Sequence, residues 1–437
     1  MMIINTKPTV RIVLPLLLFM SMVLPTMAQT DRVVVDGVVY TFQPFGPGGD
    51  FAVSDIDYET LPYDGVITIK DGLILEAFPG EFRPYPVTSI LDNAFLDQDV
   101  LKGVIFEDGI QSIGSNAFKG CVGITSLTLP ASLLRVGWGA LACGDNLKWI
   151  DARNVGDQWK DEYDGYDGLG EIGVPLFTLL YMPQWCSEGG TNVVLTDPNT
   201  QERSCQDFYF DSGEDYNVPW GFTAEKIRTT RELPMDESAY TICLPYSLPV
   251  PQGAKAYSLE KKDDNEVSFK QITGDMEAFK PYLIVSHESD VQLNCEGEQR
   301  LPSTEEAVAQ FDTANGVTIH GTFRRIDYNE AAIGNYYVLQ EDNVWKPVGG
   351  GHSNVTVPPY RAYLTLDGTQ TASFYIGFSD DTDGISSPES MSPADSSSDG
   401  WLTLDGRHLN GKPEKKGIYI HGRKKVVVDF ISLKFRK

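Results

Sequence analysis

The chain is short of basic residues. It carries 35 Lys and Arg against 61 Asp and Glu, which gives a formal net charge of −26. A protein that binds nucleic acid by displacing counterions needs a basic face. The charge balance therefore argues against nucleic acid as a partner. An acidic surface is also an ordinary route to solubility, so the charge predicts little more.

Cysteine is scarce as well, with six residues in 437. In an exported protein they could form up to three disulfides, too few to define a disulfide scaffold. Cys121 and Cys143 could form a bridge or two buried thiols; we favour thiols, because free cysteine is among the most buried residue types. Cys186 and Cys205 flank a turn-rich region and are the better disulfide candidates. No side chains stand at metal-ligand spacing, and we expect neither a metal nor a cofactor.

Catalytic motifs are missing too. The sequence contains no Gly-x-Ser-x-Gly nucleophile elbow and no phosphate-binding loop. Ser286, His287 and Asp290 stand together, but the members of a catalytic triad normally come from distant segments. Adjacent residues on a strand also point to opposite faces. We interpret this run as a surface turn and predict a protein that is not an enzyme.

Long hydrophobic runs are confined to the start of the chain. Residues 1–28 have the pattern of a secretory signal peptide, because Lys7 and Arg11 precede the apolar run Ile12–Leu24 and Thr26-Met27-Ala28 offers small residues for cleavage. The junction has no cysteine for a lipid anchor, and no later run approaches the length of a membrane span. We therefore expect a secreted or cell-surface protein.

A sequence repeat with a period of 23 occupies positions 87–155. Ser89–Phe95 returns as Ser112–Phe118 and again as Arg135–Leu141. A period of this order, with apolar side chains at fixed phases, is the signature of a leucine-rich-repeat solenoid, in which stacked units share one core. Four inward ladders are predicted: Ile90/Ile113/Val136, Phe95/Phe118/Leu141, Leu101/Ile124/Leu147 and Val104/Leu127/Ile150.

The same phases predict an outward binding face. On parallel strands the residues on either side of an inward position point away from the core. The candidate face consists of Gly103, Ile105, Ser126, Thr128, Trp149 and Asp151. Tryptophan is the kind of aromatic that anchors a protein or sugar partner. The alternative is that the array is short and that the acidic segment after Asn154 covers Trp149.

The regions around the repeats differ in composition. Residues 29–86 are expected to form an N-terminal β cap, because Asp36-Gly37 between β-branched runs predicts a hairpin. Residues 156–221 are an acidic connecting segment. Its first part, 156–171, is interpreted as a solvated loop rather than a calcium site because the EF-hand spacing fails, and the apolar run Val174–Met182 that follows predicts one more strand. Short apolar runs over 222–378, separated by turn-rich segments, predict a β-rich domain resembling a sandwich or an irregular barrel.

The last part of the chain reverses the charge. Residues 379–400 are rich in Ser, Asp, Gly and Pro and are expected to be a flexible linker. Residues 401–437 carry ten Lys or Arg against three Asp or Glu, so 10 − 3 gives +7. Its apolar runs predict a small β module. A separate basic module on a linker suits a sorting signal, and the alternative is a tail with no role of its own.

These motifs resemble a known family. Ala117-Phe118-Lys119-Gly120-Cys121 followed by Ile124–Pro130 is similar to the repeat of the BspA-like leucine-rich-repeat surface proteins of Bacteroidetes. Leu404–Arg407, Lys416–Ile420 and Lys424–Val428 resemble the C-terminal sorting segment of type IX secretion. The third repeat departs from the pattern at Leu141-Ala142-Cys143, and the chain continues past the usual end of a sorting segment. The resemblance implies adhesion to extracellular-matrix proteins or partner cells.

The sequence therefore predicts a mainly β protein, poor in helix. A short leucine-rich-repeat solenoid is followed by a β-sandwich-like domain and a small C-terminal β module. The expected function is non-catalytic binding of an extracellular protein, either a matrix or a cell-surface protein. The alternative is a glycan-binding accessory protein of a nutrient-capture system, with 222–378 as its contact domain.

Overall fold

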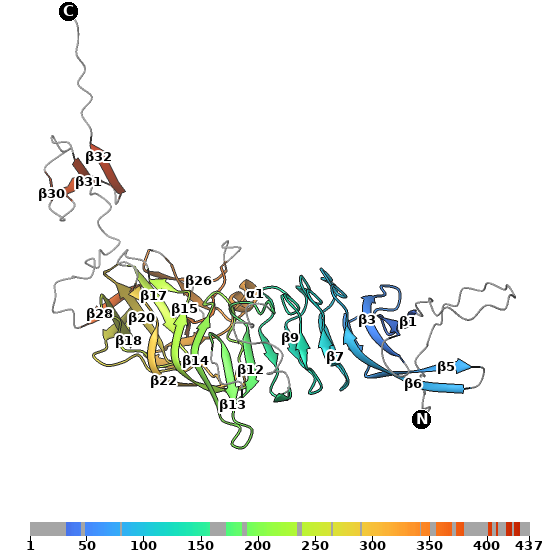
Figure 1. Ribbon diagram of the computed structural model, residues 1–437. Coiled ribbons are helices and arrows are strands. Elements are labelled where there is room, and N and C mark those ends of the chain that lie inside the picture. Colours follow the sequence, from blue (N-terminus) through green and yellow to red (C-terminus); the bar gives the residue numbers. More distant parts are fainter. Residues whose placement is uncertain are drawn as a thin grey trace, which may run out of the picture. The chain divides into compact units, whose positions relative to one another are not determined.

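A computed structural model describes most of the chain (Figure 1). The described residues are 32–44, 49–78, 81–157, 172–185, 190–233, 238–263, 265–288, 291–340, 342–349, 355–368 and 373–379, together with strand segments between 401 and 428. They divide into two compact units, 1–379 and 380–437. The structure is mainly β, as predicted, with one short helix among the described residues.

The first face of the solenoid is a sheet with the order β1-β2-β3-β6-β8-β10. From β3 onward its strands are parallel, and Ile113 pairs with Ile90 on one side and Val136 on the other. A further strand, β5, forms a hairpin with the first half of β6. The bounds are β1 (Arg32–Val35), β2 (Val38–Gln43), β3 (Asp50–Ile56), β5 (Gly72–Phe78), β6 (Glu81–Ile90), β8 (Ser112–Ile113) and β10 (Arg135–Val136).

The second face is made by β4 and β7 and, beside them, by a longer sheet of order β9-β11-β12-β13-β14-β15-β22. The strands from β9 to β13 are parallel and follow chain order. The bounds are β4 (Val66–Ile69), β7 (Gly103–Phe106), β9 (Ser126–Thr128), β11 (Trp149–Asp151), β12 (Leu179–Pro183), β13 (Val193–Thr196), β14 (Arg203–Phe210), β15 (Phe222–Thr229) and β22 (Cys295–Leu301).

The turn that follows each short strand of the first face has a fixed backbone conformation. Asn93, Asn116 and Gly139 occupy the same phase of successive repeats, and all three have positive φ, of 59°, 55° and 64°. Asparagine and glycine are the residues that adopt this left-handed region most readily. The turns also stack directly, because the Asn93 amide donates to the Ser115 carbonyl at 2.9 Å. The repeat is therefore held by backbone hydrogen bonds as well as by its core.

Stacking continues beyond the periodic segment in both directions. Before the repeats, β4 pairs with β7 and β3 with β6, so the segment 29–86 contains an early irregular unit rather than only a cap. After them, the Leu141 amide donates to the Ile172 carbonyl at 2.8 Å, and Trp149 pairs with Leu179, a step along the chain that is longer than the repeat period. The segment 156–221 thus supplies sheet strands in addition to a loop. Most of the predicted acidic loop lies outside the described residues.

The remaining part of the first unit is a curled sheet of ten strands. Its order is β17-β20-β18-β19-β28-β26-β25-β27-β24-β23, and β17 also contacts β27. This is closer to the irregular barrel than to the sandwich among the two predicted architectures. The bounds are β17 (Ala239–Cys243), β18 (Ala254–Lys262), β19 (Glu266–Gln271), β20 (Pro281–Ser286), β23 (Phe311–Ala314), β24 (Val317–Thr322), β25 (Tyr337–Leu339), β26 (Val344–Pro347), β27 (Arg361–Leu366) and β28 (Phe374–Ser379).

Three smaller elements complete the described residues. Strands β16 (Glu232–Leu233) and β21 (Val291–Gln292) pair with each other. Helix α1 (Tyr328–Ile333) begins after Asp327, whose carboxylate accepts from the Glu330 amide at 2.8 Å and caps the helix. The second unit is a four-stranded antiparallel sheet in the order β30-β29-β31-β32, with bounds β29 (Trp401–Thr403), β30 (His408–Leu409), β31 (Gly417–His421) and β32 (Lys424–Val428).

Four hydrophobic cores lie among the described residues of the first unit, and the smallest surrounds Ala331 of α1. The first fills the solenoid between its two faces. The second joins the outer face of the long sheet, including Leu179 and Tyr181, to residues of the curled sheet such as Ile242 and Ile284. The third lies inside the curled sheet around Trp345. The domain boundary predicted at residue 222 therefore does not coincide with a break, because β15 and β22 belong to the solenoid's sheet.

Candidate functional site

The four inward ladders occupy the positions that the repeat predicted. All twelve residues are buried, and none is more than 8 % exposed. Phe95 and Phe118 stack on each other with ring centroids 5.1 Å apart. A Cβ placed on Gly114 would lie 2.5 Å from the Asp92 amide nitrogen, so glycine is required for this close approach of successive turns. The core therefore fixes which side chains of the second face point outward.

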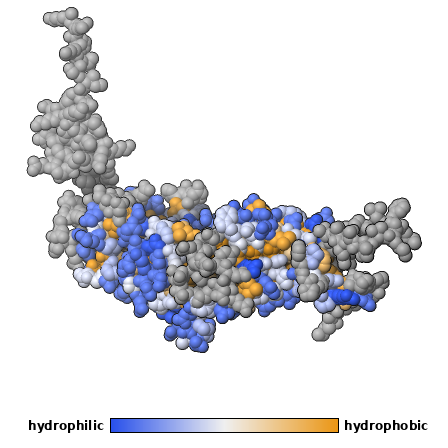
Figure 2. Space-filling view, in the orientation of Figure 1, coloured by the Kyte–Doolittle hydropathy of each residue, from blue (hydrophilic) through white to orange (hydrophobic). Residues whose placement is uncertain are grey.

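Four of the six predicted binding-face residues line an accessible surface. Ile105 is 55 % exposed, Thr128 is exposed, and Gly103 and Ser126 are half-buried. Their strands β7 and β9 contact each other. We call Gly103, Ile105, Ser126 and Thr128 the repeat face. Figure 2 shows hydrophobic surface over the repeats, interrupted by hydrophilic residues.

Of the other two predicted residues, one is buried and one is partly covered. Asp151 is 6 % exposed, so its predicted exposure is wrong. Its carboxylate accepts from Nε and a terminal nitrogen of Arg153, both at 2.8 Å. Trp149 is half-buried, and its ring packs edge-on against Trp220 at 5.4 Å. Trp149 is thus partly covered, as the alternative held, and the covering ring of Trp220 lies in the segment 156–221, just before β15.

A groove of about 380 Å³ lies beside the repeat face. Ile105 and Thr128 line it from the strands, and Phe106 and Pro130 add further apolar surface. Asp108 and Asn154 supply polar groups at its edge. A mostly apolar concavity with a few polar groups is the usual form of a recognition site. The groove extends the repeat face toward the end of its strands.

One exposed aromatic was missed by the sequence reasoning. Trp138 is 60 % exposed, and the Lys119 ammonium lies 5.6 Å from its ring centroid. Trp138 occupies the same phase of the repeat as Asp92 and Ser115. A tryptophan at a phase that is otherwise polar was the available signal. It lies on the turns rather than on the repeat face.

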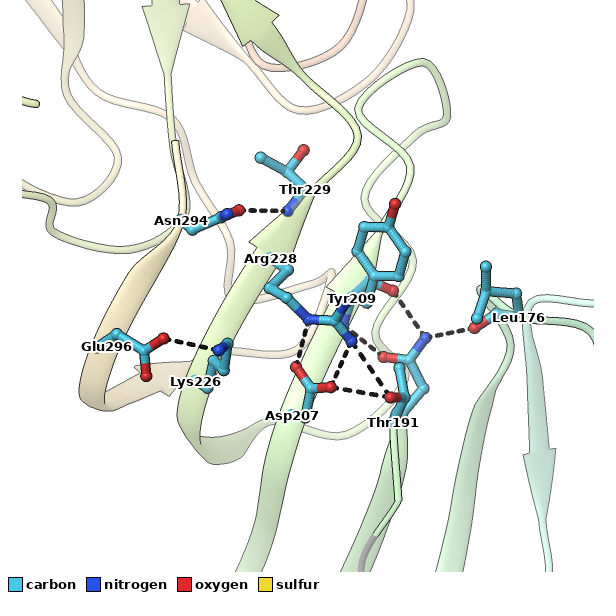
Figure 3. A network of polar contacts seen from close by, with 10 residues as sticks. Leu176, Thr191, Asp207, Tyr209, Lys226, Arg228, Thr229, Asn294 and Glu296 are labelled. Carbon is cyan, nitrogen blue, oxygen red and sulfur yellow. Dashed lines mark hydrogen bonds and ion pairs between the residues drawn. The ribbon is translucent and has the colours of Figure 1, made fainter. Parts of the chain in front are cut away.

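A polar network secures the extension of the long sheet (Figure 3). Arg228 on β15 and Asp207 on β14 form a two-pronged ion pair, and Thr191 donates to the same carboxylate at 2.8 Å. The hydrogen bond from Arg228 holds the pKa of Asp207 below its ordinary value. Asn192, which is 1 % exposed, bonds the backbone of Leu176 and Tyr209. The network fixes the sheet on which the curled domain packs.

The residues considered for chemistry do not assemble a reactive group. The Ser286 hydroxyl donates to the Glu288 carbonyl at 2.7 Å, and Asp290 lies outside the described residues. In the part of the chain that the structure describes, no three His, Cys, Asp or Glu side chains are grouped as a metal site. Nor does that part contain a helix long and apolar enough to cross a membrane.

One of the two cysteine predictions is confirmed and the other is wrong. Cys121 and Cys143 are free and buried, as favoured. Burial raises the pKa of the Cys121 thiol to about 12. The disulfide predicted for Cys205 is wrong, because Cys205 is a free thiol on β14 that faces the second core instead of the turn region. Its predicted partner, Cys186, lies outside the described residues.

Comparison with protein families identifies the repeats. Residues 83–158 match the family described as BspA type leucine rich repeat region (6 copies). The chain therefore carries leucine-rich repeats of the BspA type over this segment, as the resemblance implied. No curated protein sequence matches the chain.

Solved structures with some likeness are also leucine-rich-repeat proteins. One from Bacteroides capillosus is 17 % identical, covers 28 % of this chain and 96 % of its own, and has a TM-score of 0.22. One from Bacteroides ovatus is 15 % identical, covers 42 % and 48 %, and has a TM-score of 0.23. A leucine rich cell surface protein from Faecalibacterium prausnitzii is 15 % identical, covers 57 % and 65 %, and has a TM-score of 0.20.

Proposed function

We propose that the chain binds an extracellular protein through the repeat face, without catalysing a reaction. The observation that carries this proposal is Ile105, which is 55 % exposed on a strand of the repeat array and lines the adjoining groove. A partner that covers an exposed branched apolar side chain removes apolar area from water, and this stabilises the complex. The BspA-type repeats support a protein-binding role.

The composition of the repeat face suits a protein partner. Ile105 offers apolar area, while Ser126 and Thr128 offer hydroxyls that both donate and accept hydrogen bonds. An apolar centre with a polar surround is the usual anatomy of a protein interface. Because Asp151 is buried and Trp149 is partly covered, the centre of the proposed interface lies on β7 and β9. Thr128 and Ile105 both line the groove.

We further propose that the partner is a matrix or cell-surface protein and that the role is adhesion. The signal-like residues 1–28 and the resemblance to BspA-like surface proteins support this setting. Residues 401–437 are proposed to act as the sorting segment that delivers the chain to the outer surface. Four strands of that segment form a sheet of their own, in a unit separate from the repeats.

A parallel binding screen tests the proposal against its alternative. The purified full chain is presented to immobilised matrix proteins and to a glycan array under the same conditions. Binding to one or more matrix proteins, competed by the soluble form of the same protein, is the expected result. Binding to glycans alone would sink the adhesion proposal and favour the nutrient-capture alternative.

A further inference from the structure

A second groove, of about 450 Å³, lies between the last periodic repeat and the loop that joins β14 to β15. Three segments line most of it: residues 145–148 before β11, residues 176, 177 and 179 at the start of β12, and the loop 211–218 after β14. We call it the junction groove. It shares no residue with the repeat face or with the groove beside that face. Its volume lies within the usual range for ligand sites.

Two exposed apolar side chains form one wall of the junction groove. Leu176 is 58 % exposed and Phe177 is 37 % exposed. Both belong to a fixed turn. The buried Asn192 side-chain amide donates to the Leu176 carbonyl at 2.8 Å (Figure 3). The Phe177 ring packs edge-on against the Tyr209 ring, with centroids 5.1 Å apart. A partner that covers this wall therefore does not have to order the segment first.

Aromatic side chains form the floor of the groove. Four of them line it and are buried: Phe208, Phe210, Tyr216 and Tyr360. Tyr360 has a φ of 56°, an uncommon value for a bulky residue. Its backbone is held in place, because its amide donates to the Thr322 carbonyl at 2.8 Å and its carbonyl accepts from the Cys243 amide at 3.1 Å. The floor is therefore apolar and preformed, and the aliphatic stem of a long side chain can lie along it.

Negative charge accompanies this apolar surface. Four carboxylates line the groove, on Asp145, Asp211, Glu214 and Asp215, against the single ammonium of Lys148. The lining side chains therefore carry 1 − 4 = −3. Lys148 donates to the Glu214 carboxylate at 3.0 Å, so it neutralises one of the four.

The other three carboxylates keep free acceptor oxygens. Asp145 is exposed, and no hydrogen bond or ion pair joins its carboxylate to a described residue. Asp211 accepts from the Gly213 amide at 2.9 Å and Asp215 from the Arg325 amide at 2.6 Å, in both cases through Oδ1. Their Oδ2 atoms have no hydrogen-bond partner among the described residues.

Two arginines contact the lining segments without lining the groove themselves. Arg325 donates to the Gly213 carbonyl at 2.9 Å, and Arg231, which is 8 % exposed, donates to the Tyr360 carbonyl at 3.2 Å. Even when both are counted, the charge is 3 − 4 = −1. The side chains at the groove therefore favour a cationic ligand over an anionic one.

We propose that the junction groove binds a basic segment of a partner protein, in which a lysine or arginine stands next to a bulky apolar residue. The apolar residue covers Leu176 and Phe177, which removes apolar area from water. The stem of the basic side chain lies along the aromatic floor, and its charged end bonds the free carboxylate oxygens. Because this site shares no residue with the repeat face, the two proposals can fail separately.

Calorimetric titration of the full chain with three synthetic peptides tests the site. The first peptide carries two arginine–phenylalanine pairs separated by glycine and serine. The second has glutamate in place of each arginine, and the third has serine in place of each phenylalanine. We expect the first peptide to bind and the second not to bind. The third should bind about tenfold more weakly than the first or worse, because the apolar contact is lost.

Two variants with matched controls locate the binding. Asp145→Asn should weaken binding of the first peptide by about two- to fivefold, the range for an exposed ion pair. Asp99→Asn removes an exposed carboxylate outside the groove and should leave binding unchanged. Leu176→Ser should weaken binding by about tenfold, because apolar contact is lost. Its control is Val100→Ser, which changes an exposed apolar side chain outside the groove.

Circular dichroism verifies that each variant folds. The proposal is overturned if the first peptide does not bind, or if the glutamate peptide binds as well as the first. Equal binding of the first and third peptides would also overturn it, because it would reveal a general attraction of cations to an acidic protein. Parent-like binding by a folded Asp145→Asn or Leu176→Ser variant would do the same.

Discussion

Neighbouring residues of one repeat contribute very differently to its stability. Ile113 is 2 % exposed and pairs with Ile90 and Val136 in the parallel sheet of the first face. A carboxylate at this position would lie in the shared core of the array without a partner. Thr128, in contrast, points out of the second face and is exposed.

The two positions give a matched pair of variants. Ile113→Asp should lower the free energy of unfolding by more than about 3 kcal/mol, because it buries an unpaired charge and removes packed apolar atoms. Thr128→Asp should change it by less than about 0.5 kcal/mol, as is usual for exposed sites. Urea denaturation followed by fluorescence measures both. Equal losses would mean that the inward and outward phases are exchanged.

At the scale of elements, the sequence predicts how the strands that obey the repeat stack, but for the other strands it does not predict which strands pair. Leu127 and Ile150 keep the repeat phase, and both are buried as expected. The next strand, β12, joins the same sheet after an interval longer than the period. The chain tolerates this insertion because the entropy cost of closing a loop grows only slowly with its length. A sequence period cannot follow such an insertion. The apolar run Val174–Met182 predicts a strand there and overlaps β12, but its place in the repeat sheet was not predicted.

The candidate face was partly mispredicted for a related reason. Whether an outward residue is exposed depends on what the rest of the chain lays over it. Trp220 lies far beyond Trp149 in the chain, and nothing in the repeat indicates that their rings meet. Ile105 and Thr128 stayed accessible because the second core begins only at β11. The periodic part of the site was predictable, and the cover supplied by distant segments was not.

The ion pair between β14 and β15 should make stability depend on pH. Because Arg228 holds the pKa of Asp207 below its ordinary value, the folded state binds this proton less readily than the unfolded chain. The stabilisation is complete above the unfolded pKa of about 3.9 and is lost as the pH falls through the folded pKa.

A variant separates this contribution from the other carboxylates. Asp207→Asn should lower the free energy of unfolding at pH 7 by about 1–3 kcal/mol, the range for hydrogen bonds to charged groups. The difference from the parent protein should shrink as the pH approaches the acid limit. Urea denaturation at several pH values measures it. A difference that stays constant down to pH values well below about 3.9 would show that the ion pair is not the cause.

The whole molecule consists of two units, to which we assign separate tasks. Residues 1–379 contain the repeat face and all four cores, and residues 380–437 contain the small C-terminal sheet. Fold class and the presence of this terminal β module were predictable from composition and apolar runs. The joining of solenoid and curled sheet through one shared core was not, because it depends on contacts between β14, β15 and residues far along the chain.

Deletion of 401–437 tests the division of tasks. The thermal unfolding midpoint of the truncated protein should stay within about 2 °C of the parent, because the four cores lie in the other unit. Delivery to the outer surface should fail, as measured by surface labelling of intact cells that express each form. Normal display of the truncated protein would refute the sorting role while leaving the repeat face untouched.

Binding of a protein by the repeat face around Ile105 is the central proposal. Its most direct test is the affinity of Ile105→Arg for a matrix protein that the parent chain binds, measured by surface plasmon resonance. Ile74→Arg is the matched control, because Ile74 is 73 % exposed on β5, outside the repeat face. We expect Ile105→Arg to weaken binding by about tenfold or more, the usual effect at an interface centre, and Ile74→Arg to leave it unchanged. An Ile105→Arg variant that folds and binds with the parent affinity would contradict the proposal.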